Sequence, residues 1–445
     1  MRSLTLLVML STAPAAAAVL EAEPSNYRKQ LDRLAPGDVL RLAPGTYRER
    51  LPIIGKHGDA ARPIVIEGPA RDDTKGDATA GGAATFVGMR GQNTVDLRNC
   101  SFVTVRNITV DCAGLPVDGV NAKGDVPVHD VTIENVVILN AGANQQIVGI
   151  NTKCPCWNWT IRGCEIIGAG TGMYLGNSNG EAPFIRGVVE YNRVYDPEGY
   201  CIEIKHQNAW PADAPTGAGR TIIRHNVLIK TDRPSGSGDR PNLLFGGFPD
   251  VGPGSEDRYE VYGNFVAHNP RESLVQATGR FSIHDNLLVG AKKETSAGIF
   301  ATAHQRKPVR LAHVYNNTVY GCGRGIRAAS GSRIDACIGN LVLGDDPISG
   351  DISVKAGNLT APTTEATAYV GRPSLVLEEM NFAPRSERCR GEGLDLERFH
   401  GDENFDRDFA GAPKGDRTFR GCYTGDDARR WTPANTLKPR VGGGL

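Results

Sequence analysis

One short stretch of the sequence combines an acid, a base and several cations that together could remove a proton beside a carboxylate. Glu203 and Lys205 stand two residues apart in a β-prone run, so on a strand their side chains share one face, about 6.5–7 Å apart. Such a reaction needs a cation that neutralises the carboxylate and a base for the acidified proton. Lys205 is the expected base, with His206 and Arg240 as further catalytic candidates.

The same stretch offers oxygen ligands for a metal ion. Proteins bind Ca²⁺ through carboxylate and amide oxygens, and Glu203, Asn151 and Asn177 are the candidate ligands. Ca²⁺ is the one cofactor that the sequence suggests, and it would hold a substrate carboxylate. Glu203 would then order either this cation or Lys205, and arginines are the alternative to the metal.

Further cations and aromatic rings crowd the neighbouring turns, beside the insertions 209–219, 231–240 and 249–257. The candidate substrate-binding residues are Lys153, Tyr174, Trp210, Phe245, Arg271 and Arg280. Each feature also has a structural interpretation: the acid and lysine as a surface ion pair, the rings as packing for the insertions, and the arginines as pins for inserted loops. Their coincidence in the same turns favours a site in the middle of the chain.

Recurrent short strands must position these residues. Runs of β-branched residues broken by Asn recur at 102–110, 131–138, 221–229 and 281–289, without helical patterns between them. A period of about 22 to 38 residues built from short strands is typical of a β-solenoid. We expect one right-handed parallel β-helix of about nine or ten turns. Its turn-edge or internal Asn ladder would contain Asn107, Asn135, Asn192, Asn226, Asn264, Asn286, Asn317 and Asn340.

A second series of short strands lies between the Asn runs and would carry the site. Side chains alternate across a strand, so residues beside the buried positions form two solvent-facing columns. The first column is predicted to be Asn121, Asn151, Tyr174, Glu203, Phe245, Gln276, Phe300 and Arg327. The second is predicted to be Lys123, Lys153, Gly176, Lys205, Gly247, Thr278, Thr302 and Ala329.

Both ends of the repeat region resemble known β-helix proteins. Segments 34–47 and 55–68 look like the opening of bacterial β-helix polysaccharide lyases, closest in style to the chondroitinase B and alginate lyase family. Segments 408–413 and 421–423 resemble the closing motif of pectate-lyase-like proteins. In the lyase family a strand carries metal-binding Glu before a catalytic Lys, and 203–205 is similar, although only Glu198 offers the usual second Glu. The middle segments also resemble uncharacterised exported β-helix proteins.

The ends and the cysteines suggest an exported chain. Arg2, an apolar run and an alanine string at 15–18 are typical of a signal peptide over residues 1–18, which predicts a secreted or periplasmic protein. We expect a capped β-helix over 19–372 and an irregular cover over 373–445. Disulfides are expected at Cys389–Cys422 and Cys322–Cys337. No later apolar run is long enough for a membrane span.

These observations favour a polysaccharide lyase that cleaves an acidic, uronate-containing glycan by β-elimination. Lys and Arg balance Asp and Glu at 50 each, so nucleic acid is not an expected partner, and a monomer is expected. A glycoside hydrolase would need two carboxylates flanking one bond, and the outward columns hold only Glu203. A uronate epimerase and a non-catalytic glycan-binding module remain open on the same scaffold.

Overall fold

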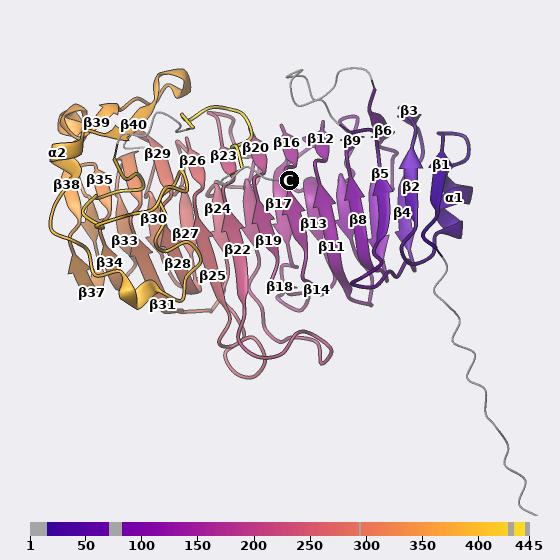
Figure 1. The fold of residues 1–445 in the computed structure, drawn as a ribbon, viewed down its shortest axis with the longest axis horizontal. Helices are drawn as coiled ribbons and strands as arrows, with labels where there is room; N and C mark the ends of the chain where they lie inside the picture. Colours follow the sequence, from indigo (N-terminus) through magenta and orange to yellow (C-terminus); the bar gives the residue numbers. More distant parts are fainter. Residues whose placement is uncertain (1–15, 71–81, 293–294, 426–430, 441–445) are drawn as a thin grey trace, which may run out of the picture.

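The computed structural model describes residues 16–70, 82–292, 295–425 and 431–440, and nearly all regular structure in them is β-strand. The strands form three long parallel sheets, which we call A, B and C, and the chain visits them in that order once per turn. Figure 1 shows the resulting elongated solenoid, with the turns stacked from the indigo end to the orange end. The fold is therefore the expected right-handed parallel β-helix.

Each sheet takes one short strand from nearly every turn. Sheet A contains β1 (Val19–Ala22), β2 (Val39–Leu42), β5 (Ile64–Glu67), β8 (Ser101–Arg106), β11 (Val128–Glu134), β14 (Cys156–Trp157), β15 (Thr160–Arg162), β18 (Phe184–Ile185), β19 (Val188–Glu190), β22 (Arg220–Arg224), β25 (Arg258–Tyr262), β28 (Gly279–His284), β31 (Val309–Tyr315), β34 (Arg333–Ile338) and β37 (Asp351–Ala356). Sheet B contains β3 (Gly45–Tyr47), β6 (Ala84–Val87), β9 (Ile108–Asp111), β12 (Val137–Leu139), β16 (Glu165–Ile167), β20 (Arg193–Tyr195), β23 (Val227–Ile229), β26 (Phe265–Ala267), β29 (Leu287–Lys292), β32 (Thr318–Cys322), β35 (Leu341–Leu343) and β38 (Leu359–Ala361). Sheet C contains β4 (Leu51–Ile54), β7 (Val95–Arg98), β10 (Val120–Ala122), β13 (Val148–Thr152), β17 (Thr171–Leu175), β21 (Ile202–Ile204), β24 (Leu243–Phe245), β27 (Val275–Ala277), β30 (Ile299–Ala301), β33 (Ile326–Ala328) and β36 (Ile348–Ser349).

The solenoid has more turns than expected. Sheets C and B hold 11 and 12 strands in the described chain, against nine or ten expected turns. The difference arises at the N-terminus, because the first strands, from β1 to β7, pair in register without an Asn to mark each turn. Counting by Asn therefore missed them.

A continuous Asn ladder runs inside the bend between sheets A and B. Each Asn side-chain oxygen accepts the backbone N–H and side-chain N–H of the Asn one turn earlier, at 2.9 Å for both bonds from Asn226 to Asn264. The same pattern joins Asn192, Asn226, Asn264, Asn286, Asn317, Asn340 and Asn358. The ladder is therefore confirmed from Asn192 to Asn340 and continues one turn further.

Asn107 and Asn135 do not belong to this ladder, which corrects the predicted alignment by one residue. Both have positive φ, 58° and 52°, and occupy the left-handed corner position that Gly263 takes in a later turn. The inward position next to them is filled by Ile108 and Val136, which are fully buried. Asn suits both positions for different reasons, since it tolerates left-handed φ and it can also bridge turns.

We expect Asn226→Ala to reduce the free energy of unfolding by about 1–3 kcal/mol, because fully buried partners on both sides lose their hydrogen bonds. Asn135→Gly is the matched control at the corner position, where glycine meets the same positive φ without strain. Urea denaturation of both variants measures the difference. Equal losses at the two sites would contradict the distinction between ladder and corner.

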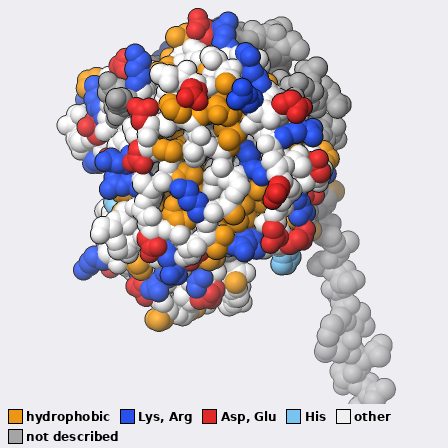
Figure 2. All heavy atoms as spheres, turned by 90° about the vertical axis from the view of Figure 1, so that its left-hand side faces the viewer, with side chains coloured by type: hydrophobic (Ala, Val, Ile, Leu, Met, Phe, Trp, Pro, Cys, Tyr) orange, Lys and Arg blue, Asp and Glu red, His pale blue; other side chains and the backbone are white. Residues whose placement is uncertain are grey.

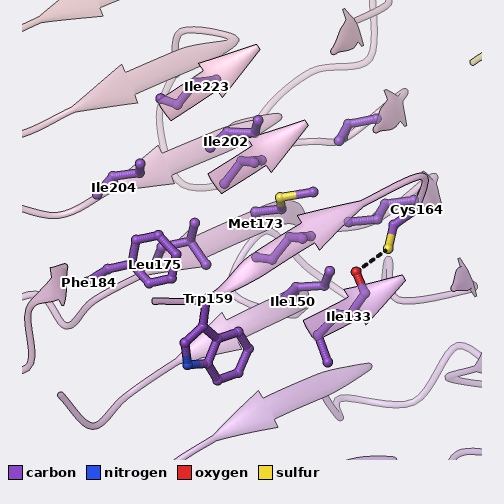
Figure 3. Close-up of a cluster of buried hydrophobic side chains, with 14 of the residues drawn as sticks. Ile133, Ile150, Trp159, Cys164, Met173, Leu175, Phe184, Ile202, Ile204 and Ile223 are labelled. Atoms are coloured by element: carbon purple, nitrogen blue, oxygen red, sulfur yellow. Dashed lines mark hydrogen bonds between the residues drawn. The ribbon is translucent and has the colours of Figure 1, made fainter. Parts of the chain in front are cut away.

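The core fills the space between the inward faces of the three sheets. Figure 3 shows its middle, where Met173 of β17 and Ile202 and Ile204 of β21 point inward from sheet C. Because side chains alternate, their neighbours Tyr174 and Glu203 must point out of the same strands. Packing of these apolar residues in the core thus places the side chains of the candidate site on the outer face of sheet C.

The two ends are closed differently. Helix α1 (Tyr27–Arg33) covers the N-terminal turn with Tyr27 and Leu31, as the predicted cap requires. Figure 2 shows the C-terminal end, where hydrophobic side chains gather in the middle of a charged rim. Half-buried Ile348 and Ile352 of the last turn pack against the core from this end.

The C-terminal tail lies along the side of the solenoid as a cover. After β38 come the 3₁₀ segments η2 (Thr363–Ala368), η3 (Leu377–Glu379) and η4 (Glu397–Phe399), helix α2 (Ser386–Cys389), and the antiparallel pair β39 (Val370–Arg372) and β40 (Asn381–Pro384). Apolar tail residues such as Phe382 and Phe409 join those of sheet B in one cluster. The pair β39–β40 spans the expected boundary at residue 372, and the three long sheets already end at Ala361.

Neither expected disulfide is formed in this structure. All ten cysteines are described, buried and free, including Cys322, Cys337, Cys389 and Cys422. Burial raises the pKa of the Cys322 and Cys337 thiols to about 12, which keeps them protonated and unreactive. They therefore act as small core residues. Among the described helices, none is long and apolar enough to cross a membrane.

Candidate functional site

The outer face of sheet C carries one row of aligned side chains that we call the outer row. Strand register places Asn121, Asn151, Tyr174 and Glu203 in consecutive positions along it. The register then continues from Glu203 through Leu244, Gln276, Phe300 and Arg327. The predicted first column is thus correct except at β24.

Phe245 is not in the outer row, so its prediction as a solvent-facing sugar platform is wrong. It pairs with Ile204 and is fully buried in the core, where its ring contacts Tyr259 and Phe281. The register on β24 is shifted by one residue relative to the prediction. The glycine next to Lys205 is consequently Gly246, whose absent side chain lets the backbone of 205–206 approach closely.

The centre of the site is a buried ion pair. Lys205 Nζ lies 2.7 Å from Glu203 Oε1, and the two side chains are only 6% and 2% exposed. The expectation that Lys205 faces solvent is therefore wrong, although the two residues do share one strand face. Burial raises the pKa of Glu203, while Lys205, Arg240 and Lys153 oppose this effect. Burial outweighs the cations, so the pKa of Glu203 stays above its usual value.

Lys153 and Tyr174 stand beside this pair on the two preceding strands. The ammonium of Lys153 lies 3.8 Å from the centre of the Tyr174 ring, and that of Lys205 lies 5.4 Å from the same ring. Burial lowers the pKa of Lys153, partly offset by Asp118 and Glu203. Burial also raises the pKa of Tyr174, so its phenol keeps its proton at neutral pH.

Arg240 reaches the centre from the insertion that precedes β24. Its guanidinium donates to the carbonyl oxygens of Ser237 and Asp239 and lies 5.8 Å from the Tyr200 ring. Its charge acts on Glu203 and on Tyr200. These partners are neutral carbonyl groups, so these contacts do not pair Arg240 with a carboxylate.

Two histidines, His206 and His304, lie within electrostatic reach of Lys205. His206 is buried, its Nδ1 has no hydrogen-bond partner, and burial and nearby Lys205 lower its pKa. His304 lies in the turn after β30, and its Nδ1 is 3.3 Å from Gln276 Nε2. Burial lowers the pKa of His304 to about 4, with further contributions from Lys205, His206 and Arg240. His304 is therefore neutral at physiological pH.

Three predicted substrate-binding residues lie outside this centre. Trp210 packs with Trp157 and Ile185 on the outer side of sheet A. This agrees with the structural interpretation, in which the ring packs the insertion. Arg271 pairs with Asp239 at 3.8 Å, and Arg280 pairs with Glu256 at 2.9 Å. Both arginines thus hold inserted loops in place.

The three predicted calcium ligands do not meet at one point. Asn151 and Glu203 are two strands apart, about 9–10 Å, whereas ligands of one Ca²⁺ lie 2.3–2.6 Å from the ion. The amide of Asn151 donates to Asp118 at 2.7 Å, and the side-chain oxygen of Asn177 accepts the Ala182 N–H. No group of three or more His, Cys, Asp or Glu that could hold a metal occurs in the described chain. These residues therefore do not fit a calcium site.

Sequence reasoning missed His304, Tyr200 and Asp118. Tyr200 lies two residues before β21 and adds a second ring near Arg240. Asp118 accepts hydrogen bonds from both Asn121 and Asn151. A signal for His304 was present, since it follows a sheet C strand just as His206 does.

Comparison with known proteins gives similarity at the level of fold. No family model matches the chain, and no curated protein does. An alginate lyase from Paenibacillus sp. str. FPU-7 is 14% identical over 77% of this chain and 99% of its own, with a TM-score of 0.43. Pectate lyase Pel9A is 14% identical over 93% and 97%, with a TM-score of 0.45. The lacto-N-biosidase from Eubacterium ramulus is 10% identical over 78% and 68%, with a TM-score of 0.41.

The three long parallel sheets of this chain confirm the expected parallel β-helix scaffold. A lyase and a glycosidase both appear among the similar structures. Sequence identities this low do not indicate which substrate this chain uses. Function must therefore be argued from the site itself.

Proposed function

We propose that this protein cleaves a uronate-containing polysaccharide by β-elimination on the outer face of sheet C. The observation that carries the proposal is the convergence of Lys153, Lys205 and Arg240 around the carboxylate of Glu203, beside a neutral histidine. Asp118 also acts on Lys153, so three cations face two carboxyl groups, which leaves a positive centre. Such a centre suits a sugar carboxylate and stabilises the extra charge that develops when the adjacent proton is removed.

The reaction breaks the C5–H and C4–O bonds of the uronate and forms a C4–C5 double bond. Lys153 and Arg240 hold the carboxylate, and Lys205 adds charge from its fixed position on Glu203. The ammonium of Lys205 is engaged by the Glu203 carboxylate at 2.7 Å, so we assign the base instead to His304, whose Nδ1 accepts from Gln276 Nε2 in the free protein. The leaving oxygen takes a proton from a phenol, since burial keeps Tyr174 and Tyr200 protonated.

Substrate binding itself would make His304 a stronger base. The low pKa of His304 reflects burial and the charges of Lys205, His206 and Arg240. A bound uronate carboxylate offsets these cations and shifts the pKa of His304 upward, toward the range in which a general base works best. Activation of the base is thus coupled to the presence of an acidic sugar.

A glycoside hydrolase fits the site less well. That reaction needs a second carboxylate at a defined distance from the first. Glu198, the nearest candidate in the sequence, accepts the Gly236 N–H and lies 3.9 Å from Arg233, and Asp118 is held by two asparagines. Export to the periplasm or medium remains part of the proposal, and residues 1–15 of the expected signal peptide lie outside the described residues.

A panel of acidic polysaccharides tests this function. Alginate, pectate, chondroitin and dermatan are incubated with the purified mature chain, with and without a chelator, and followed by ultraviolet absorbance for unsaturated products. We expect unsaturated products from at least one member, to the same extent in both conditions. New reducing ends without unsaturation would indicate a hydrolase, and binding without products would indicate a non-catalytic module. Loss of activity in chelator would refute the metal-free mechanism.

A further inference from the structure

The outer row continues beyond the reacting centre to an aromatic ring and an arginine. Phe300 lies three strands from Glu203 and Arg327 lies four strands away, about 14 and 19 Å along the solenoid. Both side chains are half-buried on sheet C, and the Arg327 guanidinium lies 5.1 Å from the centre of the Phe300 ring. A planar cation is therefore held against an aromatic surface, in the same row as Glu203.

This pair lies next to the turn that carries His304. Gln276 precedes Phe300 in the row, and its amide nitrogen lies 3.3 Å from His304 Nδ1. The turn that carries His304 is closed by backbone hydrogen bonds between His304 and Lys307. This ordered turn follows the Phe300 strand directly. A ligand that reaches His304 thus lies beside the end of the strand that carries Phe300.

Among the described residues, no carboxylate forms an ion pair with Arg327. Most arginines on the outer faces pair with a carboxylate, as Arg324 does with Asp346 and Arg333 with Asp335. Within the described residues, the observed contact of Arg327 is the ring of Phe300. An arginine placed on a ring keeps its donors available for the planar, two-point binding of a carboxylate.

We propose that Phe300 and Arg327 form a distal subsite for a second acidic sugar, with the ring packing against the sugar and the guanidinium binding its carboxylate. This inference rests on the proposed function and deepens it. The glycan then lies along the solenoid axis on sheet C, and the site spans several sugars between Lys153 and Arg327. The protein consequently discriminates by chain length and by charge at a position remote from the cleaved bond.

Chain-length dependence tests the subsite. Oligosaccharides from disaccharide to octasaccharide are prepared from the best polysaccharide of the panel. We expect Arg327→Ala and Phe300→Ala to lower kcat/KM about tenfold for the octasaccharide and to leave the shortest cleaved substrate unchanged. Arg327→Lys should retain part of the effect, because it keeps the charge and loses the planar fork. Arg333→Ala, on β34 of sheet A, is the control.

The outcomes separate the subsite from the lyase assignment. An equal loss on short and long substrates, or no loss on either, overturns the subsite while leaving the function intact. If no glycan is cleaved, the proposed function fails, and oligogalacturonate binding is measured by calorimetry instead. Tenfold weaker octasaccharide binding by Arg327→Ala, with unchanged disaccharide binding, would then still support the subsite, and unchanged octasaccharide binding would overturn it.

Discussion

Replacing His304 by alanine should lower kcat on the best acidic polysaccharide by roughly 10²–10⁴-fold, the usual contribution of a general base. His304→Gln should be equally impaired, because it preserves size and hydrogen bonding but cannot accept the proton. Neither change should unfold the protein, since the half-buried ring lies on the outer surface and its turn is held by backbone bonds. The exposed His400→Gln in the tail is the control and should retain full activity.

The pH profile gives this assignment a second test. A base acts only when unprotonated, so activity should fall as pH decreases through the pKa of His304. That pKa is about 4 in the free enzyme, which places the acidic limb of kcat/KM near this pH. The limb of kcat should lie at higher pH, because the bound carboxylate offsets the surrounding cations. Near-normal turnover by His304→Ala would contradict the assignment and favour Lys205 or His206 as the base.

The fold was largely predictable because its signals are local and repeated. Alternation of buried and outward residues in segments such as 201–205 places Glu203 and Lys205 on one face without any knowledge of the tertiary structure. The Asn positions were less decisive, since the same residue serves a left-handed corner at Asn135 and an internal ladder at Asn192. Both choices look alike in sequence, which explains the one-residue error.

The site was harder to predict because burial and proximity between turns are not local properties. The run at 243–247 has three apolar residues in succession, so its register was ambiguous, and Phe245 was placed on the wrong face. Nothing in the segment around Lys205 indicates that its side chain is buried, nor that His304, many residues later, comes within electrostatic reach of it. The rows of side chains on sheet C were predictable from the sequence. The neighbours that other turns bring close to these rows were not.

Breaking the buried pair of Glu203 and Lys205 should cause a large loss of stability. Lys205→Met removes the ammonium from Glu203 and leaves a nearly inaccessible carboxylate without its closest partner. Loss of one partner of a buried ion pair typically costs about 3–5 kcal/mol of unfolding free energy. The double variant Glu203→Gln/Lys205→Met removes both charges and should regain most of this stability. It should nevertheless remain impaired in β-elimination, because the cation that supports the carboxylate is absent.

The pH dependence of stability distinguishes this explanation from simple loss of packing. Burial already raises the pKa of Glu203, and removing Lys205, its strongest counter-charge, raises it further. A carboxyl group with a raised folded-state pKa binds its proton more tightly when folded, so its unfavourable effect is absent below the unfolded pKa of about 4.3 and grows as pH rises. The deficit of Lys205→Met should therefore be smallest near pH 4 and largest above neutral pH, as measured by urea denaturation. A deficit that is independent of pH, or a double variant as unstable as the single one, would show that Lys205 contributes through packing and not through its charge.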